Sequence, residues 1–194
     1  MRLVEVNVTE GELSLARAGD AAAQQRIYQA VAPATLTLIR RFVGRGAISE
    51  DLFQDTMVTM YEQLAQFRGE APFGAWLRQI AISRCLMYLR SPWRRARLCL
   101  AALELDTSAA ALPLATVPVT PELIDVERAL AHLPSTARAV VWMYEVEGFS
   151  HEEIGRSFGR SVSFSKSQLA RAHARLRAWF APPGTESHVQ RIRP

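Results

Sequence analysis

Apolar residues recur at intervals of three and four along most of the chain, which is the pattern of amphipathic helices. The first clear stripe holds Ile27 and Val31, and Pro33 is expected to end that helix. Further stripes then predict helices over about 34–43, 49–67 and 74–89, the first of them closed by Gly44 and Gly46. Since period-two patterning is almost absent, the sequence predicts an all-α fold.

Polar residues mark where the N-terminal helices begin. Thr9 and Glu12 have the spacing of a capping box, in which each side chain bonds the backbone N–H of the other residue. A short helix is expected to follow and to end at Gly19, and Asp20 can cap the next helix. Val4, Val6 and Val8 alternate like a strand, but a lone strand has no partner in a helical chain. We therefore expect a flexible N-terminus.

A second helical region begins near Leu123, breaks at Pro134 and resumes through Glu147. Beyond it, Ser150 and Glu153 form another capping box ahead of a short helix. Gly159 allows a sharp turn through positive φ, and Ser161 can cap the helix that follows. Two helices joined by a tight glycine turn predict a helix-turn-helix, with an ordinary αα-hairpin as the alternative.

The second helix of this pair has two expected faces. Its predicted buried positions are Val162, Leu169, Ala172, Leu176 and Trp179. Its predicted outward positions carry basic and amide groups, at Lys166, Ser167, Gln168 and Arg171. Groups of this kind can hydrogen-bond base edges in the DNA major groove.

Composition divides the 194 residues into two helical domains and a linker. Residues 101–121 are rich in Ala, Leu and Pro and contain no Lys or Arg, so they predict an extended connection. The predicted boundaries are 10–97, 98–121 and 122–181, with a disordered tail after Pro182. The net charge is +4, and the arginines cluster over 84–97 and 156–177. This clustering suits a phosphate-bearing partner, although a GC-rich genome gives the same arginine bias.

The sequence offers little support for metal, redox or membrane chemistry. Cys85 and Cys99 have no metal-ligand spacing, so they are expected to be reduced thiols. No uncharged segment reaches the roughly 18 residues of a membrane span, and no secretion signal is present, which predicts a cytoplasmic protein. His151-Glu152-Glu153-Ile154-Gly155 begins like a zinc-protease motif but has Gly at the second ligand position. We therefore expect no enzyme activity, no metal and no cofactor.

Several segments, taken in order, resemble extracytoplasmic-function sigma factors, the small dissociable specificity subunits of bacterial RNA polymerase. LARAGDAAAQQRIYQAVAP over 15–33 resembles the opening of their N-terminal domain, EDLFQDT over 50–56 their polymerase-binding helix, and FRGEAPFGAWLRQIAISRCLMYL over 67–89 their promoter-melting segment. The segments LPSTARAVVWMYEVEGFSHEEIG and KSQLARAHARLR, within 133–177, resemble the domain that reads the upstream promoter element. These segments follow one another in the family's order between residues 15 and 177.

The resemblance assigns expected roles to three groups of residues. The core polymerase-binding set is Glu50, Asp51, Gln54 and Asp55, an acidic surface on one helix face. The set for the downstream element and for melting is Phe67, Arg68, Phe73, Trp76, Ser83, Arg84 and Arg90, where aromatic rings would stack on unpaired bases. The set for the upstream element is Ser163, Lys166, Ser167, Gln168 and Arg171. For Phe73 and Trp76, simple core packing is the alternative.

Some positions depart from the family pattern. Ile48 and Ser49 stand where Asp-Ala usually begins the acidic motif, and Ser83 stands where Asn is common. Ser165 occupies a place usually held by a β-branched core residue, so Phe164 is expected to supply that packing. These differences leave the promoter sequence unpredictable.

The resemblance implies three partners: bacterial core RNA polymerase, promoter DNA and an anti-sigma factor. The main alternative is a stand-alone helix-turn-helix regulator, for which the acidic helix and the aromatic loop would have no purpose. A protein that uses sigma-like surfaces to titrate a regulator is a further alternative.

Overall fold

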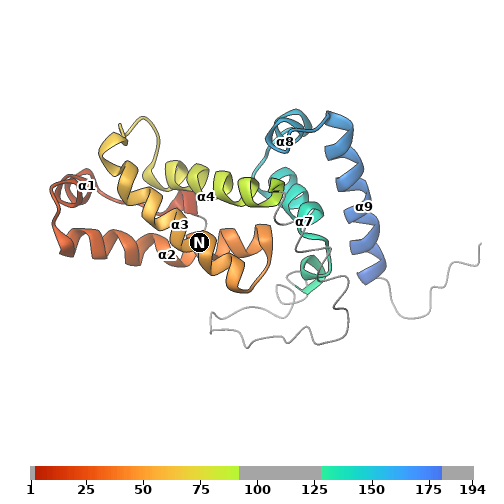
Figure 1. Cartoon of the computed structure of the whole chain (residues 1–194), viewed down its shortest axis with the longest axis horizontal. Coiled ribbons are helices and arrows are strands. Elements are labelled where there is room, and N and C mark those ends of the chain that lie inside the picture. The colour runs from red at the N-terminus through yellow and green to blue at the C-terminus, as the bar shows by residue number, and fades with distance from the viewer. Residues whose placement is uncertain (1–2, 92–127, 181–194) are drawn as a thin grey trace, which may run out of the picture.

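The computed structural model describes residues 3–91 and 128–180, and every regular element in these two ranges is helical (Figure 1). The all-α prediction is confirmed for this part of the chain. The predicted linker over 98–121, the tail after Pro182, Cys99, and the arginines at 94, 95 and 97 lie outside the described residues. The domain boundaries themselves stay predictions.

The N-terminal half is a bundle built around one long helix. It contains α1 (Glu10–Arg17), α2 (Ala21–Val43), α3 (Ala47–Gln63) and α4 (Phe73–Arg90). The central helix α2 packs against α1, α3 and α4, and α3 also packs against α4. Its buried stripe includes Ile27, Val31, Ile39 and Phe42, which are almost completely excluded from solvent.

The predicted helix starts at both N-terminal caps are confirmed. The Thr9 hydroxyl accepts a hydrogen bond from the backbone N–H of Glu12, and the Glu12 carboxylate accepts one from the N–H of Thr9. A carboxylate oxygen of Asp20 accepts from the backbone N–H of Ala23 at 2.6 Å. These contacts satisfy N–H groups that a helix start would otherwise leave unpaired.

The predicted break at Pro33 is wrong, because α2 continues through this residue without interruption. A proline inside a helix costs about 3 kcal/mol through a lost hydrogen bond and steric conflict. The residues on either side lie on one continuous buried stripe, from Ile27 and Val31 to Leu38 and Phe42. Burying each large side chain contributes roughly 1.5–3 kcal/mol, so the combined packing exceeds the local cost.

The expectation of a flexible N-terminus is also wrong. Residues Leu3–Glu5 form a short 3-10 turn, η1, that packs against α4 and α2. Leu3, Val6 and Val8 are buried. Gly74 in the first turn of α4 makes the close approach possible, since a Cβ there would lie 2.0 Å from the carbonyl oxygen of Leu3.

The C-terminal half combines short helical segments with one long helix. Residues 128–131 are helical, and after Pro134 come α7 (Ser135–Val141) and a π-helical turn, η3 (Trp142–Val146). The chain continues with α8 (His151–Ser157) and α9 (Val162–Phe180), and α9 packs against both α7 and α8. In Figure 1 these elements form a lobe beside the bundle, and contacts between α2 and α7 join the two halves.

The close approach at Gly74 gives a test of the N-terminal packing. Gly74→Ala should lower the free energy of unfolding by about 1–3 kcal/mol, because the added methyl overlaps backbone atoms of Leu3. Gly11→Ala is the matched control: it also falls at the second residue of a helix, where nothing lies within 4 Å. Urea unfolding followed by circular dichroism measures both. A loss no larger for Gly74→Ala than for Gly11→Ala would contradict the packing.

Candidate nucleic-acid and polymerase interfaces

The helix-turn-helix is formed by α8, a tight turn and α9. Gly159 adopts φ +61°, as its predicted role in the turn requires. The sequence pattern assigns Gly155 no role in the turn, but a Cβ on Gly155 would lie 2.9 Å from the carbonyl oxygen of Ser161. The backbone N–H of Arg160 donates to the carbonyl of Gly155 at 2.8 Å. The turn therefore folds directly back onto α8.

Both predicted caps of the helix-turn-helix are present. The Ser150 hydroxyl accepts from the backbone N–H of Glu153, whose carboxylate accepts from the N–H of Ser150 at 2.8 Å. The backbone N–H and the hydroxyl of Ser150 both donate to the Glu153 carboxylate at 2.8 Å and lower its pKa, the backbone bond contributing most. At the start of α9, the Ser161 hydroxyl lies 3.4 Å from the backbone nitrogen of Phe164, which donates to it.

The buried face of α9 agrees with the prediction only in its middle. Leu169 and Ala172 are buried, but Val162 and Trp179 are 40% and 45% exposed, so their predicted burial is wrong. They lie near the two ends of a helix longer than either α7 or α8, so these shorter helices cannot cover its full length. Trp179 instead rests against the ring of His132, with centroids 4.0 Å apart.

Ser165 itself occupies the core position that Phe164 was expected to fill. It is completely buried, and its hydroxyl lies 3.0 Å from Nδ1 of His151. Phe164 is half-buried and packs against Phe158, with ring centroids 5.6 Å apart. The hydrogen bond to His151 gives a small polar residue a partner where an apolar one is usual.

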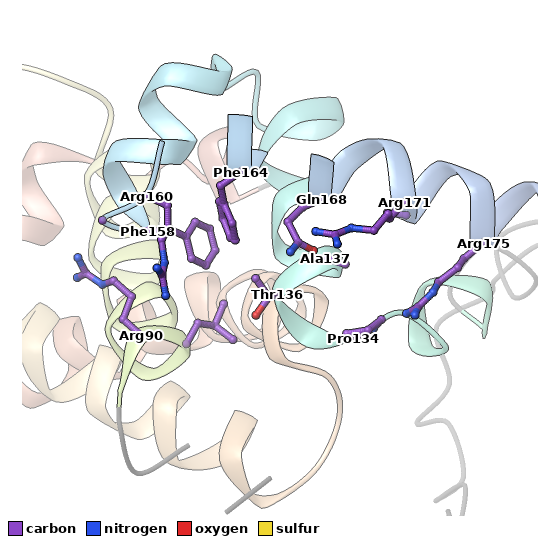
Figure 2. A pocket seen from close by; sticks show the side chains of 13 residues that line it. Arg90, Pro134, Thr136, Ala137, Phe158, Arg160, Phe164, Gln168, Arg171 and Arg175 are labelled. Carbon is purple, nitrogen blue, oxygen red and sulfur yellow. The ribbon is translucent and has the colours of Figure 1, made fainter. Parts of the chain in front are cut away.

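The five residues predicted to read the upstream element divide between two neighbouring faces of α9. Ser163, Lys166 and Ser167 are exposed. Gln168 and Arg171 line a cleft of about 630 Å³ that also involves the end of α4 (Figure 2). The Arg171 guanidinium donates to the carbonyl oxygen of Ser167 at 3.2 Å, which holds it along the helix.

The aromatic loop is more closed than the sequence suggested. Phe67 and Phe73 are 8% and 4% exposed, and both pack against Trp76 with ring centroids 5.1 and 5.4 Å away. Phe67 and Phe73 therefore pack among other rings in this conformation, which for Phe73 is the core packing given as the alternative. Trp76 is half-buried, and the Arg68 side chain is 83% exposed.

Arg17 of α1 holds the backbone that leads into this loop. Its guanidinium donates to the carbonyl oxygens of Leu64 and Phe67, at 3.2 and 2.9 Å, and forms an ion pair with Glu10. Since Leu64 and Phe67 lie 47 and 50 positions from Arg17, no local pattern marked this residue. The residue fixes the position from which Arg68 extends.

The remaining downstream-element residues lie along α4. Ser83 and Arg90 are exposed, while Arg84 is half-buried and donates to the Thr59 hydroxyl at 2.6 Å. Arg84 therefore joins α4 to α3. Trp93, further along the same basic segment, lies outside the described residues.

The acidic face of α3 is largely accessible. Asp51, Gln54 and Asp55 are exposed, whereas Glu50 pairs with Arg40 of α2 at 2.7 Å. Val58, one turn further along, is 56% exposed and extends this face with an apolar patch that the sequence reading passed over. The surface combines carboxylates with a hydrophobic contact point.

The remaining candidate chemistry is sparse in residues 3–91 and 128–180. This part of the chain contains no cluster of three or more His, Cys, Asp or Glu residues able to hold a metal ion. Burial raises the pKa of the Cys85 thiol to about 12, which keeps it protonated. Among the described helices, none is long and apolar enough to cross a membrane.

These features define a two-part helical protein of the DNA-binding class, and comparison with known families agrees. Residues 27–95 match Sigma-70 region 2, and residues 123–176 match Sigma-70, region 4. The ECF RNA polymerase sigma factor SigM of Mycobacterium tuberculosis is 34% identical over 128 residues, 66% of this chain and 62% of that protein. The ECF RNA polymerase sigma-E factor of Escherichia coli is 29% identical over 144 residues, 70% of this chain and 75% of that protein.

A solved structure has a similar fold. In the co-crystal structure of the sigma factor RpoE with the anti-sigma factor NepR from Bartonella quintana, the matched chain has a TM-score of 0.52 and 22% identity. The match covers 80% of this chain and 94% of that one. The chain belongs to the extracytoplasmic-function sigma factors of the sigma-70 family.

The Ser150 cap generates a pH prediction. Because the folded-state pKa of Glu153 is lowered, its stabilising effect is present above the unfolded-state pKa and is lost as the pH falls through the folded value. Wild type should therefore be more stable than Glu153→Gln at pH 7, and the difference should shrink as the pH falls below the unfolded-state pKa of about 4.3 and on through the lower folded-state value. Urea midpoints across this range measure it.

Glu152→Gln serves as the control, since that carboxylate pairs only with Arg156 on the surface and does not touch the cap. The urea midpoint of Glu152→Gln should differ less from wild type at pH 7 than the midpoint of Glu153→Gln does. A difference between wild type and Glu153→Gln that stays constant from pH 7 to pH 3 would show that the cap does not depend on the carboxylate charge.

Proposed function

We propose that this protein binds core RNA polymerase and directs promoter-specific transcription initiation, as an alternative sigma factor. The observation that carries the proposal is the ordered match to region 2 and then region 4. The described surfaces are consistent with it, because the acidic α3 face and the basic faces of α4 and α9 lie on separate elements. A plain DNA-binding regulator has no use for the acidic face.

The polymerase contact is assigned to α3. The exposed side chains of Asp51, Gln54 and Asp55 offer charge and hydrogen-bond acceptors to a basic partner, and Val58 adds apolar area. Glu50 contributes less charge than its position suggests, since Arg40 already neutralises it. Together these groups suit a basic coiled coil of the polymerase.

Downstream promoter recognition is assigned to the aromatic loop and α4. Arg68, Ser83 and Arg90 are accessible for phosphate or base contacts, and Trp76 offers a partly open ring. Phe67 and Phe73 serve as the packed base of the loop in the described conformation. Arg84 keeps α4 against α3 through Thr59.

Upstream recognition is assigned to α9. Lys166 and Arg171 can bond guanine O6 and N7, and Gln168 can bond adenine N6 and N7. Ser163 and Ser167 are small enough to let the helix approach the groove closely. The protein then performs no chemistry itself and acts in the cytoplasm, where the polymerase is. An anti-sigma factor is proposed as its regulator, as in the RpoE–NepR complex.

The decisive experiment reconstitutes the full chain with bacterial core RNA polymerase on a fragmented library of its own genome, followed by sequencing of run-off transcripts. Start sites that share a two-part upstream motif are expected. Binding to core without specific transcripts would favour a titrating role. Tight duplex binding without any affinity for core would favour a stand-alone regulator and overturn the proposal.

Asp51→Arg should weaken binding to core polymerase about ten-fold or more, because it places like charge against a basic partner. Glu152→Arg makes the same charge change on α8 and should leave core affinity near wild type. Fluorescence anisotropy of the labelled chain titrated with core measures both. Equal affinities for the two variants would remove α3 from the interface.

Arg171→Ala should cost about 1–3 kcal/mol of promoter binding by the holoenzyme and relax preference at one upstream base pair. Arg177→Ala removes another exposed arginine from the same helix and should weaken binding to all sequences alike. Competition binding with single-base promoter variants distinguishes them. A uniform loss for Arg171→Ala would show that Arg171 contacts only phosphate.

A further inference from the structure

Helix α9, proposed to read the upstream element, is held to its own lobe at few points. Of its 19 residues, only Ser165, Leu169 and Ala172 are buried. Leu169 and Ala172 make apolar contacts, which are favourable over a range of orientations. Ser165 is the first of the three along the chain and is completely buried. It therefore anchors the end of α9 that carries Lys166 and Ser167.

The Ser165 hydroxyl is hydrogen-bonded to a neighbouring helix. Its oxygen lies 3.0 Å from Nδ1 of His151, which is the first residue of α8 and lies 14 positions earlier in the chain. In the N-terminal bundle, the buried hydroxyls of Thr35, Thr56 and Thr59 instead donate to carbonyl oxygens four residues earlier on their own helices. A bond within one helix satisfies a buried hydroxyl without relating two helices. The Ser165 bond constrains how α9 lies on α8.

The imidazole of His151 is itself held in place. Its ring stacks on the ring of Tyr144, with centroids 4.4 Å apart and an angle of 15° between the ring planes. Because Tyr144 belongs to η3, a third element orients the imidazole that meets Ser165. A hydroxyl can donate or accept, so either neutral tautomer of His151 completes the bond. An oriented ring and a directional bond together define one position for the Ser165 side chain.

Small rotations of α9 about its axis have large effects on base reading. The residues that follow Ser165 lie at steps of about 100° around the helix. A side-chain tip about 6 Å from the helix axis moves by about 1 Å for each 10° of rotation. A binding geometry tolerates displacements of only about 0.5 Å. A contact that fixes the rotation of α9 therefore also fixes which base edges Lys166 and Gln168 can reach.

We propose that the buried hydrogen bond between Ser165 and His151 is a specificity determinant, which sets the rotation of α9 and thereby the base preference at the upstream element. Ser165 acts as a positioning residue, because it is completely buried and cannot touch a base itself. A serine in place of the usual β-branched residue exchanges non-directional packing for a directional bond. The inference rests on the proposed reading role of α9 and adds two residues outside the predicted reading set.

The first measurement asks whether the two side chains are coupled. Ser165→Ala removes the hydroxyl, and His151→Phe keeps a ring beside Tyr144 but removes Nδ1. Urea unfolding gives the unfolding equilibrium constant of each variant and of the double variant. The double variant should raise this constant at least about three-fold less than the product of the two single effects, since both remove the same bond. Equality with the product would overturn the proposal.

The second measurement determines base preference. The full chain is assembled with core RNA polymerase, and competition binding with promoters changed at one base pair each gives a preference profile. Ser165→Ala should lower the preference ratio about five-fold or more at one or more upstream base pairs, as expected when a base contact is displaced. His151→Phe should change the profile at the same base pairs. Ser165→Thr keeps the hydroxyl and should stay close to wild type.

Ser157→Ala is the matched control, because it makes the same chemical change at a half-buried site on α8 and should leave the profile unchanged. An unchanged profile for Ser165→Ala would make the pair purely structural and overturn the specificity role. A profile altered as strongly by Ser165→Thr as by Ser165→Ala would also overturn it, since the hydroxyl would then not be the cause.

Failure of this inference differs from failure of the proposed function. Wild-type protein that shows no promoter-specific binding with core polymerase would contradict the proposed function and, with it, the specificity role. Wild-type protein with a clear preference profile that Ser165→Ala leaves unchanged would contradict the specificity role alone. The unfolding measurement needs neither polymerase nor promoter, so it tests the hydrogen bond independently of both.

Discussion

Burial of the apolar stripe of α2 is the constraint on which the rest of the structure depends. Ile27, Val31, Ile39 and Phe42 place this helix against α1, α3 and α4, and its C-terminal part reaches α7. The free energy gained by this packing exceeds the local cost of a proline, so α2 continues through Pro33. Both α3 and α4 pack against α2, so this helix positions the acidic surface of α3 and the basic surface of α4.

The charged surfaces are built from side chains that the core leaves free. On α3, one face buries Leu52 and Met60 and another exposes Asp51 and Asp55. Ion pairs then adjust what each surface presents: Arg40 neutralises Glu50, and Glu147 engages Arg78. Net charge alone, at +4, describes neither surface, because the partners of individual residues decide which charges remain available.

The sequence by itself determined the helical class, both capping boxes, the Gly159 turn and the exposed acids of α3, because each depends on residues a few positions apart. Only the tertiary structure decided the contacts between distant segments. Pairing of Arg78 with Glu147 spans 69 positions, the aromatic rings of the loop cover one another, and Leu3 packs on Gly74. Such contacts leave no periodic trace in the sequence, since they arise from the three-dimensional packing of whole helices.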